Sequence, residues 1–129
     1  MASVYIYWVS TTLLCLLYLT STYMYATKGD WVRKALADLG YPAYLVRFMI
    51  VVKIVGPVAI VSRFNVVLSD LAYAGVFYHL LLSGMAHIGV RSLKGALPAA
   101  IGLILLAASF ATQNVAREVP SPYVQAAML

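Results

Sequence analysis

The chain has 129 residues, of which 64% are apolar and 10% are charged, and its mean hydropathy is +0.90. A soluble domain of this length does not need so much apolar surface, so these values exclude a soluble globular domain and indicate a membrane protein. The formal charge of +5 does not point to nucleic acid, because the nine Lys and Arg residues are scattered, most of them near the ends of apolar segments, and form no dense run.

The first apolar segment covers residues 5–26 and predicts a membrane-spanning helix. It is too long and too rich in Tyr and Thr for a cleaved signal peptide, and no basic region precedes it. We therefore expect it to remain in the mature protein. Cys15, the single cysteine, lies inside this segment, so the sequence offers no intrachain disulfide.

A short amphipathic helix is predicted over residues 30–40, which have the sequence DWVRKALADLG. Apolar residues recur on one face and charged residues on the other, as in helices that lie in the membrane interface. Asp30 suits the N-terminal cap of this helix, and Gly40 suits the position that ends it.

Three further apolar segments predict membrane-spanning helices over residues 43–61, 68–88 and 97–116. The loops between them are short, and short loops force consecutive helices to pack antiparallel. We therefore expect one transmembrane domain over residues 1–129 with an all-α fold, an antiparallel four-helix bundle in the membrane with the interfacial helix between the first and second spans. Residues 119–129 contain two prolines and no periodic pattern, which predicts a tail that is loose or only weakly docked on the bundle.

Lys53 lies near the middle of the second span, where hydrocarbon tolerates a charge only if it faces a bundle interior, a partner or a wet cavity. A snorkelling ammonium would have roughly 15 Å to cover from there, which is more than a lysine arm reaches comfortably. Pro57 cannot donate a hydrogen bond to the carbonyl of Lys53, and Gly56 eases deformation, so we predict a hinge at these two residues. We expect Lys53 to point inward, either paired or facing a ligand.

Three polar residues share one face of the third span, because His79, Ser83 and His87 are spaced four residues apart. A lone histidine in an apolar helix is often a structural hydrogen-bonding residue, and this interpretation stays open. Histidines eight residues apart do not chelate one metal ion, and no carboxylate lies near them in the sequence, so we predict no metal site. The functional alternative is proton handling or hydrogen bonding to a ligand.

Most of the ten tyrosines lie near span ends, where they suit the aromatic belt of a membrane protein. The aromatic residues assigned to the belt include Tyr5, Tyr7, Trp8, Tyr23, Tyr25, Tyr41 and Tyr44. Tyr18 lies deeper, and with Thr22 and Tyr25 it approaches the membrane face where the third span ends. Antiparallel packing brings Lys53 and His79 to a similar depth. We therefore predict that Lys53 and His79 share one buried polar pocket in mid-membrane and that the other three residues contribute to ligand or proton handling.

With these patterns in place, the chain resembles the DoxX-like family of small four-helix membrane proteins. The resemblance covers roughly residues 10–116, and its most specific part is LGYPAYL followed by VVKIVGPVAI. Tyr25 stands where many relatives carry a lysine, and His79 stands where many carry an acidic residue. The resemblance implies the four-helix fold, together with roles that range from membrane partners of thiosulfate:quinone or other redox systems to receptor-assembly chaperones.

For function, we expect an accessory or partner subunit of a membrane-bound redox or biosynthetic complex with a polar pocket inside the membrane. One alternative is a quinone-binding or lipid-binding protein that uses this pocket, and another is a small transporter or proton conductor. No catalytic residue, nucleotide loop or nucleophile elbow is evident, so a stand-alone enzyme is not expected. We expect no intrinsic cofactor, and the candidate ligand is a quinone or another isoprenoid or lipid.

The expected partners are the lipid bilayer and either other membrane subunits or further copies of this chain, with no nucleic acid. We expect a bacterial-type plasma membrane. The first and third loops carry more basic residues than the opposite side, so the positive-inside rule predicts both termini outside. These loops contain Lys28, Arg33, Lys34, Arg47, Arg91 and Lys94, and the opposite side contains Arg63 and Arg117.

Overall fold

The computed structural model describes residues 2–42 and 44–127, and every regular element in them is a helix. The helices are α1 (Ala2–Thr27), α2 (Gly29–Asp38), α3 (Leu45–Ser62), α4 (Val66–Gly89), α5 (Leu93–Ala116) and α6 (Pro122–Ala127). The four longest, α1, α3, α4 and α5, are each long and apolar enough to cross a membrane. This confirms the predicted all-α fold with four membrane-spanning helices.

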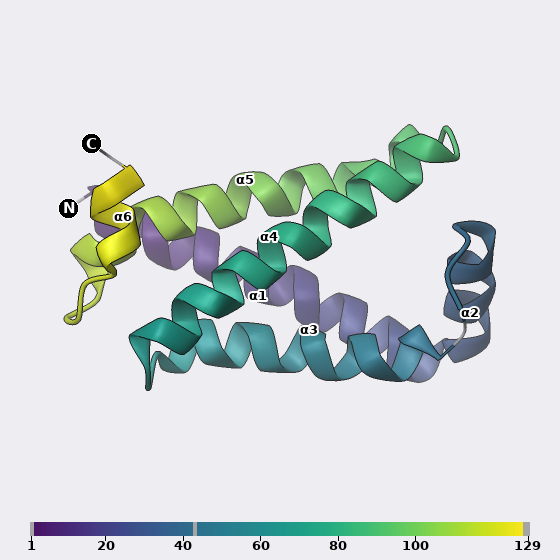
Figure 1. Ribbon diagram of the computed structural model, residues 1–129, viewed down its shortest axis with the longest axis horizontal. Helices are drawn as coiled ribbons and strands as arrows, with labels where there is room; N and C mark the ends of the chain where they lie inside the picture. The colour runs from purple at the N-terminus through teal and green to yellow at the C-terminus, as the bar shows by residue number, and fades with distance from the viewer. Residues whose placement is uncertain (1, 43, 128–129) are drawn as a thin grey trace.

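The four long helices run alternately in opposite directions and form a ring (Figure 1). Helix α1 packs against α3 and α5, and α4 packs against the same two helices, so α1 and α4 lie on a diagonal. Helix α2 lies at one end of the bundle with the loop at residues 90–92, and we call this the α2 end. Helix α6 lies at the opposite end with residues 2–8, and we call this the terminal end.

A small apolar core holds the ring together, and most other large apolar side chains face outward. The core contains Leu14, Ile60, Val76, Leu80 and Leu106, one or two from each long helix. Outward apolar side chains are stable only where the surroundings are also apolar, so the outer surface of the bundle suits lipid.

Helix α2 packs one apolar face on the bundle and exposes the rest. Val32 and Leu36 are buried against Val46 of α3. Gly40 adopts a positive φ of 87° directly after Leu39, the C-terminal cap of the helix, which agrees with its predicted role in ending it. Asp30 is not the N-terminal cap, because the helix begins one residue earlier, at Gly29. The carboxylate of Asp30 instead pairs with Arg33 at 2.9 Å.

The described part of the predicted tail, residues 119–127, docks on the bundle, as in the docked alternative of the prediction. Asn114 donates from Nδ2 to the carbonyl oxygen of Ser121 at 2.9 Å, and the backbone N–H of Ser121 donates back to Asn114 Oδ1 at 2.7 Å. The hydroxyl of Ser121 donates to Asp70 Oδ2 at 2.9 Å. Paired polar contacts therefore hold the segment in place, whereas the prediction considered only apolar periodicity. Residues 128–129 lie outside the described residues.

Two arginines fasten the terminal end. Arg63 donates from Nη1 to Gln113 Oε1 at 2.6 Å and from Nη2 to the carbonyl oxygen of Val119 at 2.5 Å. Arg117 donates from Nη1 to the hydroxyl of Tyr7 at 3.1 Å. Tyr7 is fully buried, so it belongs to the bundle interior and not to the predicted aromatic belt.

Candidate functional site

Lys53 lies inside the bundle, with 5% of its surface exposed. Its ammonium lies 5.1 Å from the ring centroid of Tyr18 and 5.0 Å from that of Tyr25, both on α1. Helical side chains lean toward the N-terminus of their helix, so the Lys53 arm runs from mid-membrane toward the α2 end. Tyrosine faces attract a cation, so the two rings form part of an aromatic cage around the ammonium.

The Lys53 ammonium has no charged partner in the described residues. Their one ion pair joins Asp30 and Arg33 on α2, and none of their side-chain hydrogen bonds involves Lys53. A buried cation without an acceptor carries a desolvation cost that two ring faces offset only in part. An oxygen acceptor brought by a ligand would offset more of it.

Tyr18 connects Lys53 to His79. A hydrogen bond of 2.7 Å joins the Tyr18 hydroxyl and His79 Nδ1, and the two rings meet edge to face at 5.5 Å. This contact crosses the diagonal of the ring, from α1 to α4. We call Lys53, Tyr18, Tyr25 and His79 the central cluster, and it joins three of the four long helices.

In one respect the structure differs from the prediction that Lys53 and His79 share a pocket. Two of the cavities in the described part of the chain, a groove of about 770 Å³ on the outside of α4 and α5 and a smaller one beside Arg33, are lined by residues outside the central cluster. Tyr18, which is 2% exposed, contacts both side chains and fills the space between them. The central cluster is therefore a packed polar site, and a ligand would enter it by displacing side chains.

Three other predicted residues bond within their own helices. Thr22 donates its hydroxyl to the carbonyl oxygen of Tyr18 at 2.9 Å. His87 donates from Nδ1 to the carbonyl oxygen of Ser83, also at 2.9 Å. In the described part of the chain, neither Ser83 nor His87 hydrogen-bonds to Lys53, and the two lie on α4 between His79 and the α2 end. They lie nearer that end of α4 than His79 does, and they are not part of the central cluster.

The hinge predicted at Gly56 and Pro57 lies in an unbroken helix, because α3 continues from Leu45 to Ser62. Pro57 is buried, so its ring packs inside the bundle. A Cβ atom added to Gly56 would lie 3.5 Å from Val76 Cγ2, so the missing side chain lets α3 approach α4 closely. The hinge itself stays a prediction.

A second polar group lies nearer the terminal end, and the sequence prediction missed its pairing. Ser109 of α5 shares hydrogen bonds with Thr11 at 2.6 Å and with Tyr73 at 2.7 Å, and all three side chains are buried. We call these three residues the Ser109 cluster. The three residues belong to three different spans, so no local sequence pattern links them. Only the rotation of each helix about its own axis brings them together.

An apolar layer separates the Ser109 cluster from the central cluster. On α1, buried Leu14 lies between the two polar levels, and on α4 buried Val76 does the same. Leu106 contributes from α5 to the same core. Within residues 2–42 and 44–127, no group of three or more His, Cys, Asp or Glu could hold a metal ion. The chemistry that these residues offer is cation, imidazole and phenol hydrogen bonding in an apolar setting.

Comparison with known families gives one match. The model of the DoxX-like family matches residues 9–112, which is more than half of the chain and includes the whole central cluster. Nothing matches among curated proteins. No solved structure matches either.

Proposed function

Because the chain belongs to the DoxX-like family and has four helices that can cross a membrane, we propose that it binds a membrane-soluble carbonyl compound of the quinone type at the central cluster. The observation that carries this proposal is the ammonium of the buried Lys53 side chain, which has aromatic neighbours and no acceptor among the described residues.

A quinone suits this site for two chemical reasons. Its carbonyl oxygens accept hydrogen bonds, and a charged ammonium makes a stronger hydrogen bond than a neutral donor does. Its flat ring also packs well against tyrosine rings. Tyr25 is half-buried at the side of the cluster facing the α2 end, so displacement of its ring would open a route to Lys53. Any redox partner would have to be supplied by another protein.

The test replaces Lys53 with methionine, which keeps the length of the side chain and removes the charge. The protein is purified from the membrane of its source, and bound quinone is extracted and measured by mass spectrometry. We expect K53M to retain about tenfold less quinone than the unchanged protein, because a charged hydrogen bond contributes about 1.5 to 3 kcal/mol. Lys34→Met is the matched control, since Lys34 is exposed on α2.

Equal quinone retention by K53M and the unchanged protein would contradict the proposal. Circular dichroism of each variant checks that its helices remain. If K53M loses helix, Tyr25→Ala provides a second test, because it removes one ring of the cage while keeping the buried cation.

A second candidate function is that of an accessory subunit in a membrane-bound redox or biosynthetic complex. Small residues on the outer surface favour it, because they let a neighbouring helix approach closely. Gly75 on α4 is exposed, and a Cβ atom added to it would meet nothing within 4 Å. Native mass spectrometry tests this function: an associated subunit or a second copy supports it, and a monomer alone contradicts it.

A proton-conducting or transport role has less support. Conduction needs a continuous polar or wet path across the membrane, and the layer of Leu14, Val76 and Leu106 separates the two polar clusters in the described residues. The central cluster is therefore better suited to binding than to conduction.

The orientation that fits this chain has the α2 end in the cytoplasm of a bacterial-type cell. All six basic residues at the α2 end are exposed: Lys28, Arg33, Lys34, Arg47, Arg91 and Lys94. At the terminal end, Arg63 and Arg117 are partly buried and hydrogen-bonded to the bundle. The exposed basic residues therefore favour termini outside more strongly than the total count does.

A further inference from the structure

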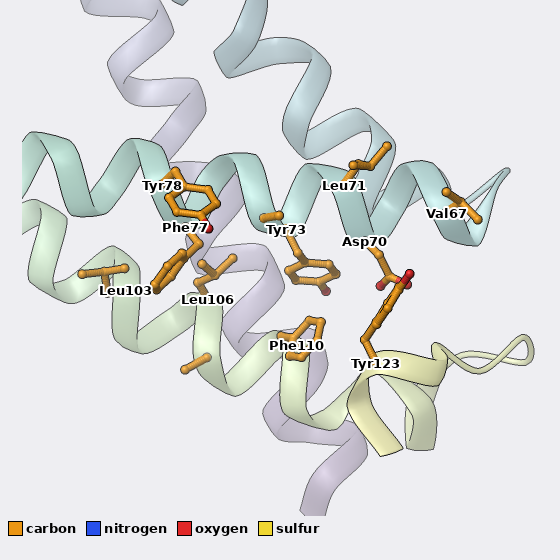
Figure 2. Close-up of a pocket in the computed structure, with 12 residues that line it drawn as sticks. Val67, Asp70, Leu71, Tyr73, Phe77, Tyr78, Leu103, Leu106, Phe110 and Tyr123 are labelled. Atoms are coloured by element: carbon orange, nitrogen blue, oxygen red, sulfur yellow. The ribbon is translucent and has the colours of Figure 1, made fainter. Parts of the chain in front are cut away.

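The groove of about 770 Å³ lies on the outer face of the bundle, between α4 and α5, and α6 borders one end of it (Figure 2). Its walls are almost entirely apolar. The lining residues are Val67, Asp70, Leu71, Tyr73, Ala74, Phe77, Tyr78, Leu103, Leu106, Ala107, Phe110 and Tyr123. Because this face belongs to membrane-spanning helices, the groove opens toward lipid.

The length of the groove matches one leaflet of a bilayer. On α4 it extends from Val67, near the first residue of the helix, to Tyr78, near its midpoint. Eleven residues of helix rise about 16 Å, and half of a hydrocarbon core is about 15 Å thick. On α5 the lining residues begin at Leu103, close to the midpoint, and continue toward the terminal end, which agrees with this extent. The groove therefore covers only the leaflet at the terminal end.

The length of the groove distinguishes between the molecules that could occupy it. A helix of a partner protein would cross both leaflets, and it is about 10 Å wide, so a groove confined to one leaflet does not match it. A long isoprenoid tail would also extend beyond mid-membrane. A single acyl chain of a phospholipid, whose head group lies at the interface, has the matching length.

The interfacial end of the groove carries one negative charge. Asp70 lies there beside Tyr123 (Figure 2), and no cation in the described residues forms an ion pair with it. Its Oδ2 accepts from Ser121, and its buried Oδ1 has no hydrogen-bond partner among the described residues. Tyr123 is 62% exposed, so its ring can turn away from the carboxylate when a head group arrives. An ammonium with N–H donors complements this carboxylate.

We propose that the groove between α4 and α5 binds one acyl chain of an aminophospholipid, with the head-group ammonium at Asp70. Phosphatidylethanolamine is the probe, because its ammonium donates hydrogen bonds. Phosphatidylcholine is the comparison, since it has the same charge and no N–H donor. This site lies on the outside of the bundle and is separate from the central cluster.

The experiment measures lipid retention by native mass spectrometry after the full chain is mixed with equal amounts of the two lipids in detergent. We expect the unchanged protein to retain phosphatidylethanolamine in preference to phosphatidylcholine. Ala107→Leu fills the groove and should reduce retention of both lipids roughly tenfold, since each buried methylene that loses its contact weakens binding several-fold. Ala100→Leu is the matched control, because Ala100 is exposed on α5, seven residues away on the same side, and outside the groove.

Asp70→Asn tests the head group separately, because asparagine keeps the shape of the side chain and an acceptor for Ser121. We expect D70N to retain both lipids about equally. Three results would overturn the proposal: equal lipid retention by A107L and A100L, an unchanged preference in D70N, or an isoprenoid in place of a phospholipid in the unchanged protein.

Discussion

Lys53 lies between two tyrosine rings where a buried cation would normally have a carboxylate. A cation–π contact contributes about 0.5 to 2 kcal/mol, whereas an unpaired buried charge costs several kcal/mol. Because part of this cost remains, Lys53 is the residue that a hydrogen-bond acceptor from a ligand would stabilise most. His79 does not take the place of the missing carboxylate, because its one side-chain hydrogen bond in the described residues is to Tyr18 and not to Lys53.

Tyr18→Phe tests the contact across the diagonal of the bundle. Phenylalanine keeps the ring beside Lys53 and removes the hydroxyl that bonds to His79 Nδ1. We expect the free energy of unfolding to fall by about 1 kcal/mol, the usual effect of one buried hydrogen bond. Thermal unfolding in detergent measures the change. Tyr78→Phe is the control, since Tyr78 is 61% exposed, and an equal loss in both variants would show that the contact adds no stability.

At the residue scale, sequence reasoning predicted the depth of the polar groups better than their partners. The positions of Lys53 and His79 within their spans were enough to bring them to one level. The bridge through Tyr18 depends on the rotation of α1 about its own axis. The sequence of α1 does not reveal this rotation, because its Ser, Thr and Tyr residues recur on every side of the helix. Tyr7 was assigned to the aromatic belt for the same reason, although its hydroxyl accepts from Arg117 inside the bundle.

At the scale of elements, α1, α4 and α5 begin before the predicted starts of their spans, and α3 begins two residues after its predicted start. Helix α4 begins at Val66, two residues before the predicted start, because Asn65 Oδ1 accepts from the backbone N–H of Val67 at 2.9 Å. Helix α5 begins at Leu93, four residues early, because Ser92 accepts from the N–H of Gly95 at 3.2 Å. Hydropathy marks where the apolar stretch begins, whereas capping side chains mark where the helix begins.

Helix packing at α5 depends on one glycine. A Cβ atom added to Gly102 would lie 2.9 Å from Leu80 Cδ2 and 3.2 Å from Leu17 Cδ2, so Gly102→Ala must push both side chains aside. We expect the variant to lose about 1 to 2 kcal/mol of unfolding free energy, because overpacking a core is destabilising. Gly75→Ala is the matched control. It meets nothing within 4 Å and should be neutral or gain up to about 1 kcal/mol from helix propensity.

Thermal unfolding of the two alanine variants separates the effect of side-chain packing on stability from the effect of helix propensity. A loss in Gly102→Ala together with no loss in Gly75→Ala supports the close approach of α5 to α4 and α1. Equal stability in both variants would mean that Leu80 and Leu17 adjust without cost and that Gly102 does not limit the spacing of the helices.

At the scale of the whole molecule, short loops were sufficient to predict the antiparallel bundle, and the docked tail was not predictable from periodicity. The tail is held by contacts that join distant parts of the sequence, such as Arg63 to Val119 and Ser121 to Asp70. Arg117 completes this arrangement by donating from Nη2 to the carbonyl oxygen of Val61 at 2.9 Å. Because these bonds occupy both arginines of the terminal end, the exposed basic residues lie at the α2 end.

This asymmetry predicts the orientation of the bundle, with the α2 end inside the cell and the terminal end outside. Replacing Cys15 with alanine first removes the single cysteine. New cysteines are then placed singly at Lys34, exposed on α2, and at Glu118, exposed at the terminal end. We expect a membrane-impermeant maleimide to label the Glu118→Cys variant in intact cells and the Lys34→Cys variant only after permeabilisation. Both should react after permeabilisation, which controls for accessibility, and labelling of Lys34→Cys alone in intact cells would reverse the orientation.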